Sequence, residues 1–450
     1  MTYLDTVARF VADTRAEDMD PEVLERTALI LADCIGAIAG GATEPEVRAL
    51  AARPGLSAPG PAAVIGTRAR VQPMAAALLN GTAGTALEMD EGTQFARGHP
   101  GIHTVPAVLA FLAARPDRTV PGRELLTAIA LGYEVGARVG IASKLRPAMH
   151  PHGTWGAICA AVGVARLAGR DAAGIARAMS MAAGLGLSTN KRTMLEGGTV
   201  RNVYAGVSNQ MGLLVEDLVA AGFEADRDGV AQVFGHVASD SFDAGAMTEA
   251  LGSRWEVCRN YFKLHACCRY NHAALDALEM ILAEAGPLEP AAVTEVAVES
   301  YSLAAELDDP TPRNALAARF SVPFAMATRL VTGTSTVESF APDRVDDPAT
   351  LALAARVSLR EDPAMTAALP DRRPARVTLT LADGRRLTRA TETNRGDWAD
   401  PFPPEALAQK FHSLAIRAWP EAEAQALWQA TLALPDTASV AGWLDRLSVR

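Results

Sequence analysis

Residues 21–41 read PEVLERTALILADCIGAIAGG, with apolar side chains recurring at the spacing of one helical face. Pro21 suits the first turn of a helix, and Gly40-Gly41 predicts its end. Similar alanine- and leucine-rich stretches, separated by Gly, Pro or Asn, occur at about 73–88, 104–114, 122–142, 154–168, 172–185 and 205–221. These stretches predict a domain of closely packed helices.

The pattern changes after about residue 290. Residues 294–301 alternate like a strand, and 376–381 with 386–388 predict a hairpin whose Asp383-Gly384 favours a type I′ turn. Helical segments are expected near 273–285 and 315–332, and the chain returns to helix over 404–446. We therefore predict a mainly α fold, in which a large all-helical domain carries an inserted, smaller α+β domain. The expected boundaries are 1–262 for the first helical part, 263–395 for the insertion and 396–450 for the helical return.

Composition narrows the class of protein. The 450 residues are 49% hydrophobic but only 5% aromatic, and the net charge of −10 argues against a nucleic-acid-binding surface. Five cysteines without a C-x-x-C pair do not make a disulfide framework. The N-terminus lacks the apolar core of a signal peptide, and no uncharged apolar run is long enough to span a bilayer. A cytoplasmic protein that binds neither membrane nor nucleic acid is expected.

Histidine is concentrated in three short clusters that hold six of the chain's eight histidines. The clusters span residues 90–103, 149–156 and 263–272. Histidine titrates near neutral pH and is the natural proton carrier of enzymes. If the three clusters meet in space, they form an acid/base site.

The first two clusters share one arrangement. In the first, Asp90 is a plausible base or orienting carboxylate, Thr93 a hydroxyl donor and His99 an acid or base. His99 precedes a predicted helix, and the segment that begins at His150 precedes another over 155–167. Backbone N–H groups at a helix N-terminus favour an anion, so we expect two helix ends that face an anionic ligand. The alternative is that these residues only form turns and caps.

The third cluster contains one of only four lysines among 42 basic residues. Lysine can lose its proton when buried, whereas arginine stays charged, so Lys263 is a candidate base. Cys267-Cys268 could supply a nucleophile beside His265, although adjacent cysteines in tight turns are more often packing residues. A further motif, residues 197–206, offers close backbone approach at its double glycine and a carboxylate-binding fork at Arg201. It could equally be a loop before the next helix.

A metal or cofactor is not expected. The His-x-His and His-x-x-x-His spacings can supply zinc or iron ligands, but proline within both disfavours regular helical geometry, and no H-E-x-x-H or cysteine pair supports them. The chain has no G-x-x-x-x-G-K-[ST] loop, no dinucleotide fingerprint and no G-x-S-x-G elbow.

Taken in order, residues 90–100, 150–154, 200–206 and 263–272 resemble the motifs of the MmgE/PrpD family, which includes 2-methylcitrate dehydratases, cis-aconitate decarboxylases and an iminodisuccinate epimerase. The resemblance covers essentially the whole chain. It implies a helical domain, a lid-like α+β domain, a homodimer, and metal-free chemistry on small polycarboxylates.

Carried over by motif, the resemblance implies that Asp90, Thr93, His99, His150 and Lys263 line the family's site. With the residues read from the clusters themselves, the predicted catalytic set is Asp90, His99, His150 and Lys263, and the predicted substrate-binding set is Thr93, His152, Arg201, Tyr204, Cys268, Arg269 and His272. Either Cys268 or His272 could fill the position of the family histidine downstream of the lysine. Two departures stand out. Arg201 and Tyr204 replace a lysine and a histidine of the decarboxylase branch, and Phe324 replaces its site tyrosine.

These residues predict an enzyme that removes a proton from the carbon next to a carboxylate in a small di- or tricarboxylic acid. Epimerisation is the favoured outcome, because Arg201 and Phe324 leave fewer acids to expel hydroxide. The alternatives are dehydration of a 2-methylcitrate-like acid and decarboxylation of a cis-aconitate-like acid. A catalytically degenerate, ligand-binding dimer is the non-enzymatic alternative.

Overall fold

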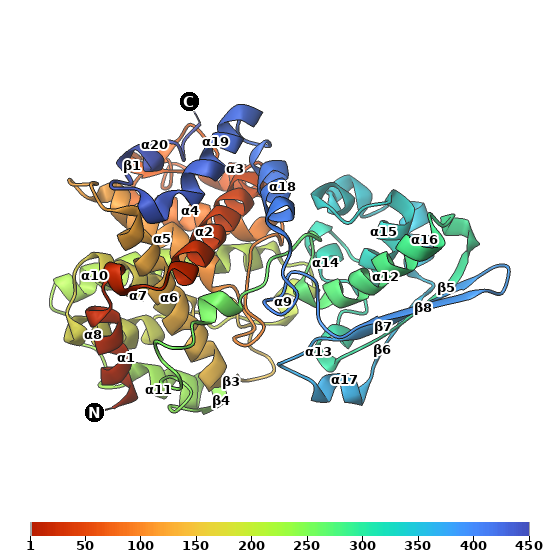
Figure 1. Ribbon diagram of the computed structural model, residues 1–450, viewed down its shortest axis with the longest axis horizontal. Helices are drawn as coiled ribbons and strands as arrows, with labels where there is room; N and C mark the ends of the chain where they lie inside the picture. The colour runs from red at the N-terminus through yellow and green to blue at the C-terminus, as the bar shows by residue number, and fades with distance from the viewer. Residues whose placement is uncertain (1, 450) are drawn as a thin grey trace. The chain divides into compact units, whose positions relative to one another are not determined.

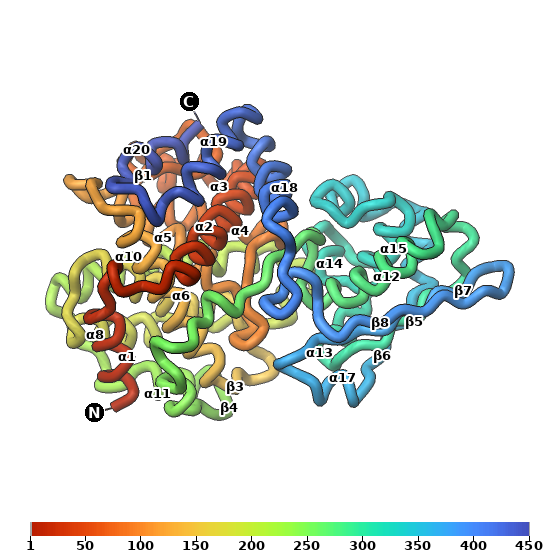
Figure 2. The backbone as a smooth tube through the Cα atoms, viewed as in Figure 1, coloured from red at the N-terminus to blue at the C-terminus, as the bar shows by residue number. Residues whose placement is uncertain are grey.

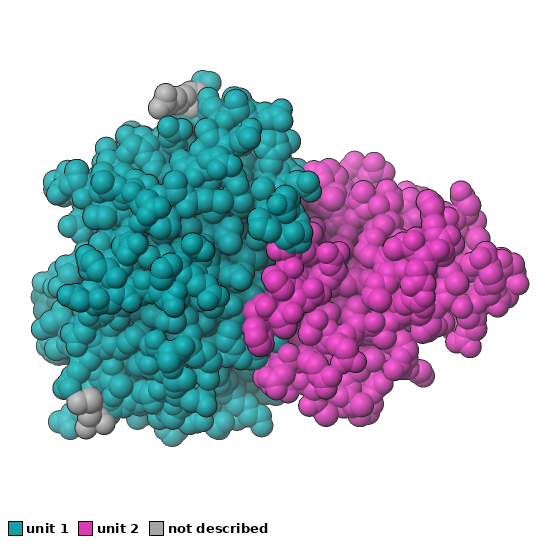
Figure 3. Space-filling model, viewed as in Figure 1, with its two compact units in different colours: residues 1–191, 202–262, 403–450 teal, residues 192–201, 263–402 magenta. Residues whose placement is uncertain are grey.

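The computed structural model describes residues 2–449 and divides the chain into two compact units. Unit 1 comprises Met1–Lys191, Asn202–Phe262 and Pro403–Arg450, and unit 2 comprises Arg192–Arg201 and Lys263–Phe402 (Figure 3). Unit 1 is helical and unit 2 mixes helices with a sheet. The predicted fold class, mainly α with a smaller α+β domain, is confirmed.

The limits of unit 2 differ from the predicted insertion at two places. Residues 192–201 lie in unit 2, where the Asn314 side chain donates to the Gly197 carbonyl at 2.8 Å. Residues 396–402 also stay in unit 2, because Arg269 forms an ion pair with Asp397 there. Both contacts join residues that are far apart in the sequence. Hydrophobic periodicity reports only on nearby residues, so it could not predict them.

Unit 1 is built from helices that pack through small residues. Its longer helices are α1 (Tyr3–Asp13), α2 (Pro21–Gly41), α4 (Pro73–Ala86), α5 (Pro100–Ala114), α6 (Gly122–Ala142), α7 (Gly156–Leu167), α8 (Ala172–Gly184), α10 (Val203–Ala220), α18 (Pro404–Ala415) and α19 (Glu421–Leu432) (Figure 1). A Cβ on Gly41 would lie 1.9 Å from the Ala83 carbonyl oxygen, so α2 and α4 can approach this closely only without that side chain. Two short antiparallel pairs, β1 (Pro59–Ala63) with β2 (Arg70–Val71) and β3 (Ser143–Leu145) with β4 (Ser239–Phe242), complete the regular structure.

Helix α6 is long and apolar enough to cross a membrane by length and composition. However, 94% of its apolar window is buried inside the protein, which is the environment of a core helix. Two of its charged residues are buried as well: Glu134 and Arg138 form an ion pair of 2.7 Å within the helix. The apolar character of α6 therefore serves the core of unit 1.

Unit 2 contains a four-stranded sheet in the order β6-β5-β7-β8. Strand β5 (Val293–Ser300) is parallel to β6 (Val357–Glu361) and antiparallel to β7 (Ala375–Leu381), which pairs with β8 (Arg386–Thr391). Helices α12 (His272–Ala285) and α15 (Val322–Thr332) pack on this sheet. Alternate residues of β7 are fully buried, as the period of two predicted.

Two local predictions in unit 2 are wrong in detail. The β7–β8 turn is not type I′, because Gly384 has φ of 86° but Asp383 does not take a positive φ. Instead, the Gly384 N–H donates to the Leu381 carbonyl, as in a hairpin that closes with a left-handed glycine. The helix expected over 315–332 is interrupted, because the Ser321 hydroxyl accepts from the Phe324 N–H and starts a new helix.

Candidate active site

His99 is held at the start of α5 with one ring nitrogen committed to the protein. Its Nδ1 lies 2.7 Å from the Glu91 carbonyl oxygen and 2.9 Å from Oδ2 of the fully buried Asp90. A carbonyl oxygen can only accept, so Nδ1 carries the proton of the neutral ring. This leaves the Nε2 lone pair to accept a proton, and the Asp90 carboxylate would stabilise the imidazolium that results.

The segment between Asp90 and His99 forms a compact loop. Thr93 and Gly98 pair through their backbones, with the Thr93 N–H 2.8 Å from the Gly98 carbonyl oxygen. The Thr93 hydroxyl is buried and makes no hydrogen bond within residues 2–449. Buried hydroxyls normally have partners, so Thr93 keeps its predicted place as a substrate-binding candidate.

The N-terminus of α5, expected to face an anionic ligand, has one of its N–H groups engaged by the protein. The Gly101 N–H donates to Oε1 of Glu91 at 2.8 Å, so a carboxyl group of the protein itself lies at this helix end. The other oxygen, Oε2, accepts from the Tyr133 hydroxyl at 3.0 Å. Burial raises the pKa of Glu91 to about 8, against the lowering effect of the Gly101 N–H.

The first and second histidine clusters meet within unit 1. The ring of His152 lies at the centre, with its centroid 5.1 Å from His99, 4.6 Å from His103 and 5.7 Å from His150. All three contacts are edge-on. Gly156 makes room for this packing, because a Cβ there would lie 2.2 Å from Nδ1 of His103.

His150 has the opposite hydrogen-bonding pattern to His99. The His152 backbone N–H donates to Nδ1 of His150 at 2.9 Å, so Nδ1 is an acceptor and the proton of the neutral ring sits on Nε2. The His150 backbone is fixed by Thr189, whose hydroxyl donates to the His150 carbonyl at 2.6 Å. The Tyr204 ring is 6.3 Å from the His150 ring. His99 thus presents a lone pair at Nε2, whereas His150 presents an N–H donor there.

Tyr261 also lies beside His99, although no sequence pattern pointed to it. Its ring centroid lies 6.3 Å from that of His99, and its backbone pairs with Gly92, with the Tyr261 N–H 2.7 Å from the Gly92 carbonyl oxygen. A Cβ on Gly92 would lie 2.5 Å from the Tyr261 hydroxyl oxygen. The only sequence signal was its position two residues before Lys263.

The third cluster lies in unit 2, where several of its side chains form hydrogen bonds or ion pairs with other residues of the protein. Lys263 is fully buried. Arg269 forms a buried ion pair with Asp397, and its Nη1 lies 3.1 Å from Nδ1 of His272. The Nε2 of His272 lies 3.3 Å from the Cys267 carbonyl oxygen. Arg269 and His272 were expected to bind substrate, and these contacts show that each also has partners within the protein.

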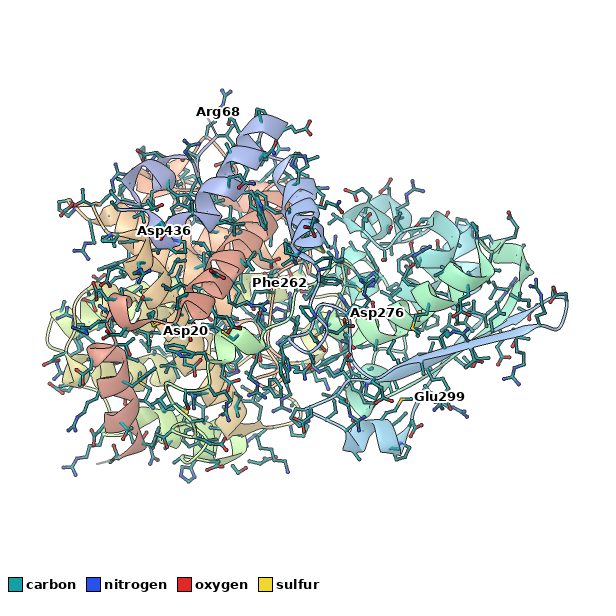
Figure 4. All side chains as sticks on the ribbon, in the orientation of Figure 1. Asp20, Arg68, Phe262, Asp276, Glu299 and Asp436 are labelled. Atoms are coloured by element: carbon teal, nitrogen blue, oxygen red, sulfur yellow. The ribbon has the colours of Figure 1, made fainter. Side chains whose placement is uncertain are left out.

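Burial lowers the pKa of His272 well below its usual value, and the adjacent Arg269 lowers it further. His272 is therefore neutral at physiological pH. Its neighbour His265 has Nδ1 2.5 Å from the Ser335 hydroxyl and Nε2 3.4 Å from Asp276, which Figure 4 labels on α12.

The remaining predicted residues of unit 2 are also buried. The Cys268 N–H donates to the Arg319 carbonyl at 2.9 Å. The Arg201 guanidinium lies 5.3 Å from the ring centroid of Phe320. Phe324 is fully buried, with its ring 6.1 Å from that of Phe340, so position 324 provides packing and no proton donor.

Within residues 2–449, no three side chains of His, Cys, Asp or Glu are arranged to hold a metal ion. In the cluster around His152, the rings meet edge to face, with interplanar angles of 83° to His99 and 82° to His150.

Several known proteins resemble the chain over much of its length. The cis-aconitate decarboxylase of Aspergillus terreus is 25% identical over 474 residues, which cover 98% of this chain and 95% of that protein. The cis-aconitate decarboxylase of Mus musculus is 23% identical over 77% of this chain and 73% of its own length. The cis-aconitate decarboxylase-like protein oryM of Aspergillus oryzae is 27% identical over 61% of this chain and 60% of its own length.

Two family domains account for most of the sequence. The MmgE/PrpD N-terminal domain matches residues 5–245, which hold the Asp90, His99 and His150 site. The MmgE/PrpD C-terminal domain matches residues 265–436, which include most of unit 2. The chain therefore belongs to the MmgE/PrpD family, as the order of its motifs predicted.

Proposed function

We propose that this protein is an acid/base lyase of small tricarboxylic acids, with decarboxylation of a cis-aconitate-like acid as its reaction. The observation that carries the proposal is the opposite protonation of His99 and His150, whose rings both contact His152. Similarity to proteins named cis-aconitate decarboxylases, over nearly the full chain, supports the substrate class.

The proposed roles follow from the ring nitrogens. When an unsaturated tricarboxylate is decarboxylated, the carbon–carboxylate bond breaks and CO₂ leaves. The electron pair moves through the alkene, and the carbon at its far end takes up a proton. The imidazolium form of His99, protonated at Nε2 and stabilised by Asp90, supplies that proton and returns to the neutral ring, while the Nε2–H of His150 donates a hydrogen bond to the substrate. In a reaction that starts by proton removal, as in dehydration, Nε2 of His99 is the base, with Asp90 stabilising its charged form.

Epimerisation was favoured from the sequence, but the named relatives do not support it. Epimerisation was favoured because Arg201 and Phe324 replace two proton donors of the decarboxylase branch. Tyr261 weakens that argument, because it places a different phenol in unit 1 beside His99. We therefore rank decarboxylation first, dehydration second and epimerisation third.

The test is incubation of the purified protein with cis-aconitate, 2-methylcitrate or iminodisuccinate in D₂O, followed by NMR and CO₂ measurement. We expect CO₂ release from cis-aconitate and a product that carries one solvent deuterium. His99→Gln and His150→Gln should each lower turnover by about 10²- to 10⁴-fold. His236→Gln is the matched control, because His236 is exposed and lies outside the cluster.

Other outcomes would replace the proposal. Deuterium exchange next to a carboxylate, without CO₂ release or a change in alkene absorbance, would identify an epimerase. Calorimetric binding of these acids without turnover of any would identify a ligand-binding protein that has lost catalysis.

A further inference from the structure

Lys410 is buried, although lysine is among the residues least often found inside a protein. It lies on α18, part of the C-terminal return, and α18 packs beside α2 near the start of the chain (Figure 2). Its Nζ donates to Oδ1 of Asp33 on α2 at 2.5 Å. The only charged partner of Lys410 within the described residues is this aspartate.

The ion pair forms hydrogen bonds with the backbone on both sides of Asp90. Lys410 Nζ also donates to the Met89 carbonyl at 2.6 Å. The other carboxylate oxygen of Asp33 accepts from the Glu91 N–H at 2.9 Å. Of the three consecutive residues 89–91, the outer two are thus held by the pair, and the middle one is the aspartate that faces His99.

From this short segment the constraint passes to His99 by two contacts. The Asp90 carboxylate and the Glu91 carbonyl lie 2.9 and 2.7 Å from Nδ1 of His99. The Glu91 side chain adds a third connection, since it accepts from Gly101, two residues after His99. The direction of the His99 ring therefore depends on the positions of residues 89–91.

We propose that Lys410 and Asp33 are positioning residues that orient the Asp90–His99 pair for proton transfer. The role given to His99 rests on the proposed function. A buried ion pair seldom stabilises a fold more than apolar side chains of similar size would, so stability alone does not explain this one. Displacement of a catalytic group by about 1 Å can reduce a rate by roughly 10²-fold. An ion pair that fixes the backbone around Asp90 can therefore affect the rate strongly.

The test replaces the pair by apolar residues in the full-length protein. In Asp33→Leu/Lys410→Met both backbone contacts are lost without leaving a buried charge. The Glu91 N–H and the Met89 carbonyl lose their partners, so we expect a folded protein with a lower unfolding temperature. We expect kcat to fall by roughly 10²-fold with little change in KM. Asp33→Asn/Lys410→Met keeps an acceptor for the Glu91 N–H and should lose less. Lys144→Met, which removes an exposed lysine on β3, is the matched control and should have wild-type turnover.

A second readout needs no substrate. In protein labelled with ¹⁵N-histidine, His99 should show a protonated Nδ1 in the wild type, and this signature should be lost or averaged in Asp33→Leu/Lys410→Met. If the wild type turns over none of the acids, the proposed function fails while this spectrum still tests the positioning role. Wild-type kcat, or an unchanged His99 spectrum, in a folded Asp33→Leu/Lys410→Met protein would overturn the positioning role. If that variant does not fold, the same criteria apply to Asp33→Asn/Lys410→Met.

Discussion

The chemistry of each side chain in this site depends on which of its atoms already form hydrogen bonds within the protein. His99 and His150 are the same residue type, yet a carbonyl oxygen beside one and a backbone N–H beside the other place their protons on different nitrogens. The chemistry of each ring is therefore set by one backbone group. Neither group could be recognised from the order of residues, because Glu91 and His152 contribute main-chain atoms that every residue has.

Lys263 allows a direct test of a base in unit 2. Lys263→Arg keeps the positive charge but cannot deprotonate at physiological pH, so we expect turnover to fall by about 10²- to 10⁴-fold. Folding should be preserved, as judged by circular dichroism. Lys144→Arg, the same change at an exposed position, should leave turnover unaltered. Near-normal turnover of Lys263→Arg would mean that Lys263 only provides charge.

Glu91 should make stability depend on pH. Its pKa is about 8 in the folded protein against an ordinary value of 4.5, so between these values the folded state holds a proton that the unfolded state has released. Stability should therefore fall as pH rises from about 5 to about 8, by up to about 1.4 kcal/mol per pH unit. Glu134, whose pKa burial raises to about 7, adds a change of the same sign.

Urea unfolding at several pH values would measure this dependence. Glu91→Gln cannot ionise and should flatten the decline between about pH 5 and pH 8, whereas Glu25→Gln, at an exposed position of α2, should not. An equally steep decline in Glu91→Gln would show that Glu91 is ionised throughout this range.

At the scale of elements, helix ends and helix contacts decide where the histidines lie. The N-terminus of α5 is occupied by Glu91, which fixes the chain just after His99. The N-terminus of α7 begins at Gly156, where the absence of a side chain lets the His103 ring lie against the helix. Sequence patterns predicted both helices, but they could not predict that the N-terminus of α5 binds the Glu91 carboxyl group.

Gly156→Ala should disturb this packing. The new Cβ would overlap the His103 ring, which packs on His152, and overpacking of a core typically costs about 1–3 kcal/mol. We expect a lower urea midpoint and reduced turnover. Gly184→Ala is the matched control, because a Cβ at this position of α8 meets no atom within 4 Å. Wild-type stability and turnover in Gly156→Ala would show that the His103 ring moves aside without consequence.

For the whole molecule, we expect full activity after extensive chelation. The rings around His152 meet edge to face, and Nδ1 of both His99 and His150 is already hydrogen-bonded, so convergent ligation by this cluster is not favoured. The measurement is turnover before and after dialysis against a chelator, with elemental analysis of the same samples. Stoichiometric zinc or iron, with activity that follows its content, would overturn the expectation.

The sequence alone determined the elements and the family. Helix α2 begins at Pro21 and ends at Gly41 as predicted, and β5 and β7 follow their alternating patterns, because these features depend on local spacing. Four ordered motifs identified the family before any fold was known, and Asp90, His99, His150 and His152 were chosen from them.

Only the tertiary structure decided what these residues do. Asp33 and Lys410 are separated by most of the chain, and their ion pair exists because α18 returns to α2. Arg269 and His272 seemed suited to substrate, but Asp397 and a backbone carbonyl engage them. A hydrogen bond depends on distances between atoms, whereas sequence patterns record only neighbours along the chain. For this reason the sequence predicts candidate residues for the site, but not the proton position on each histidine or the ion pair that holds the backbone around Asp90.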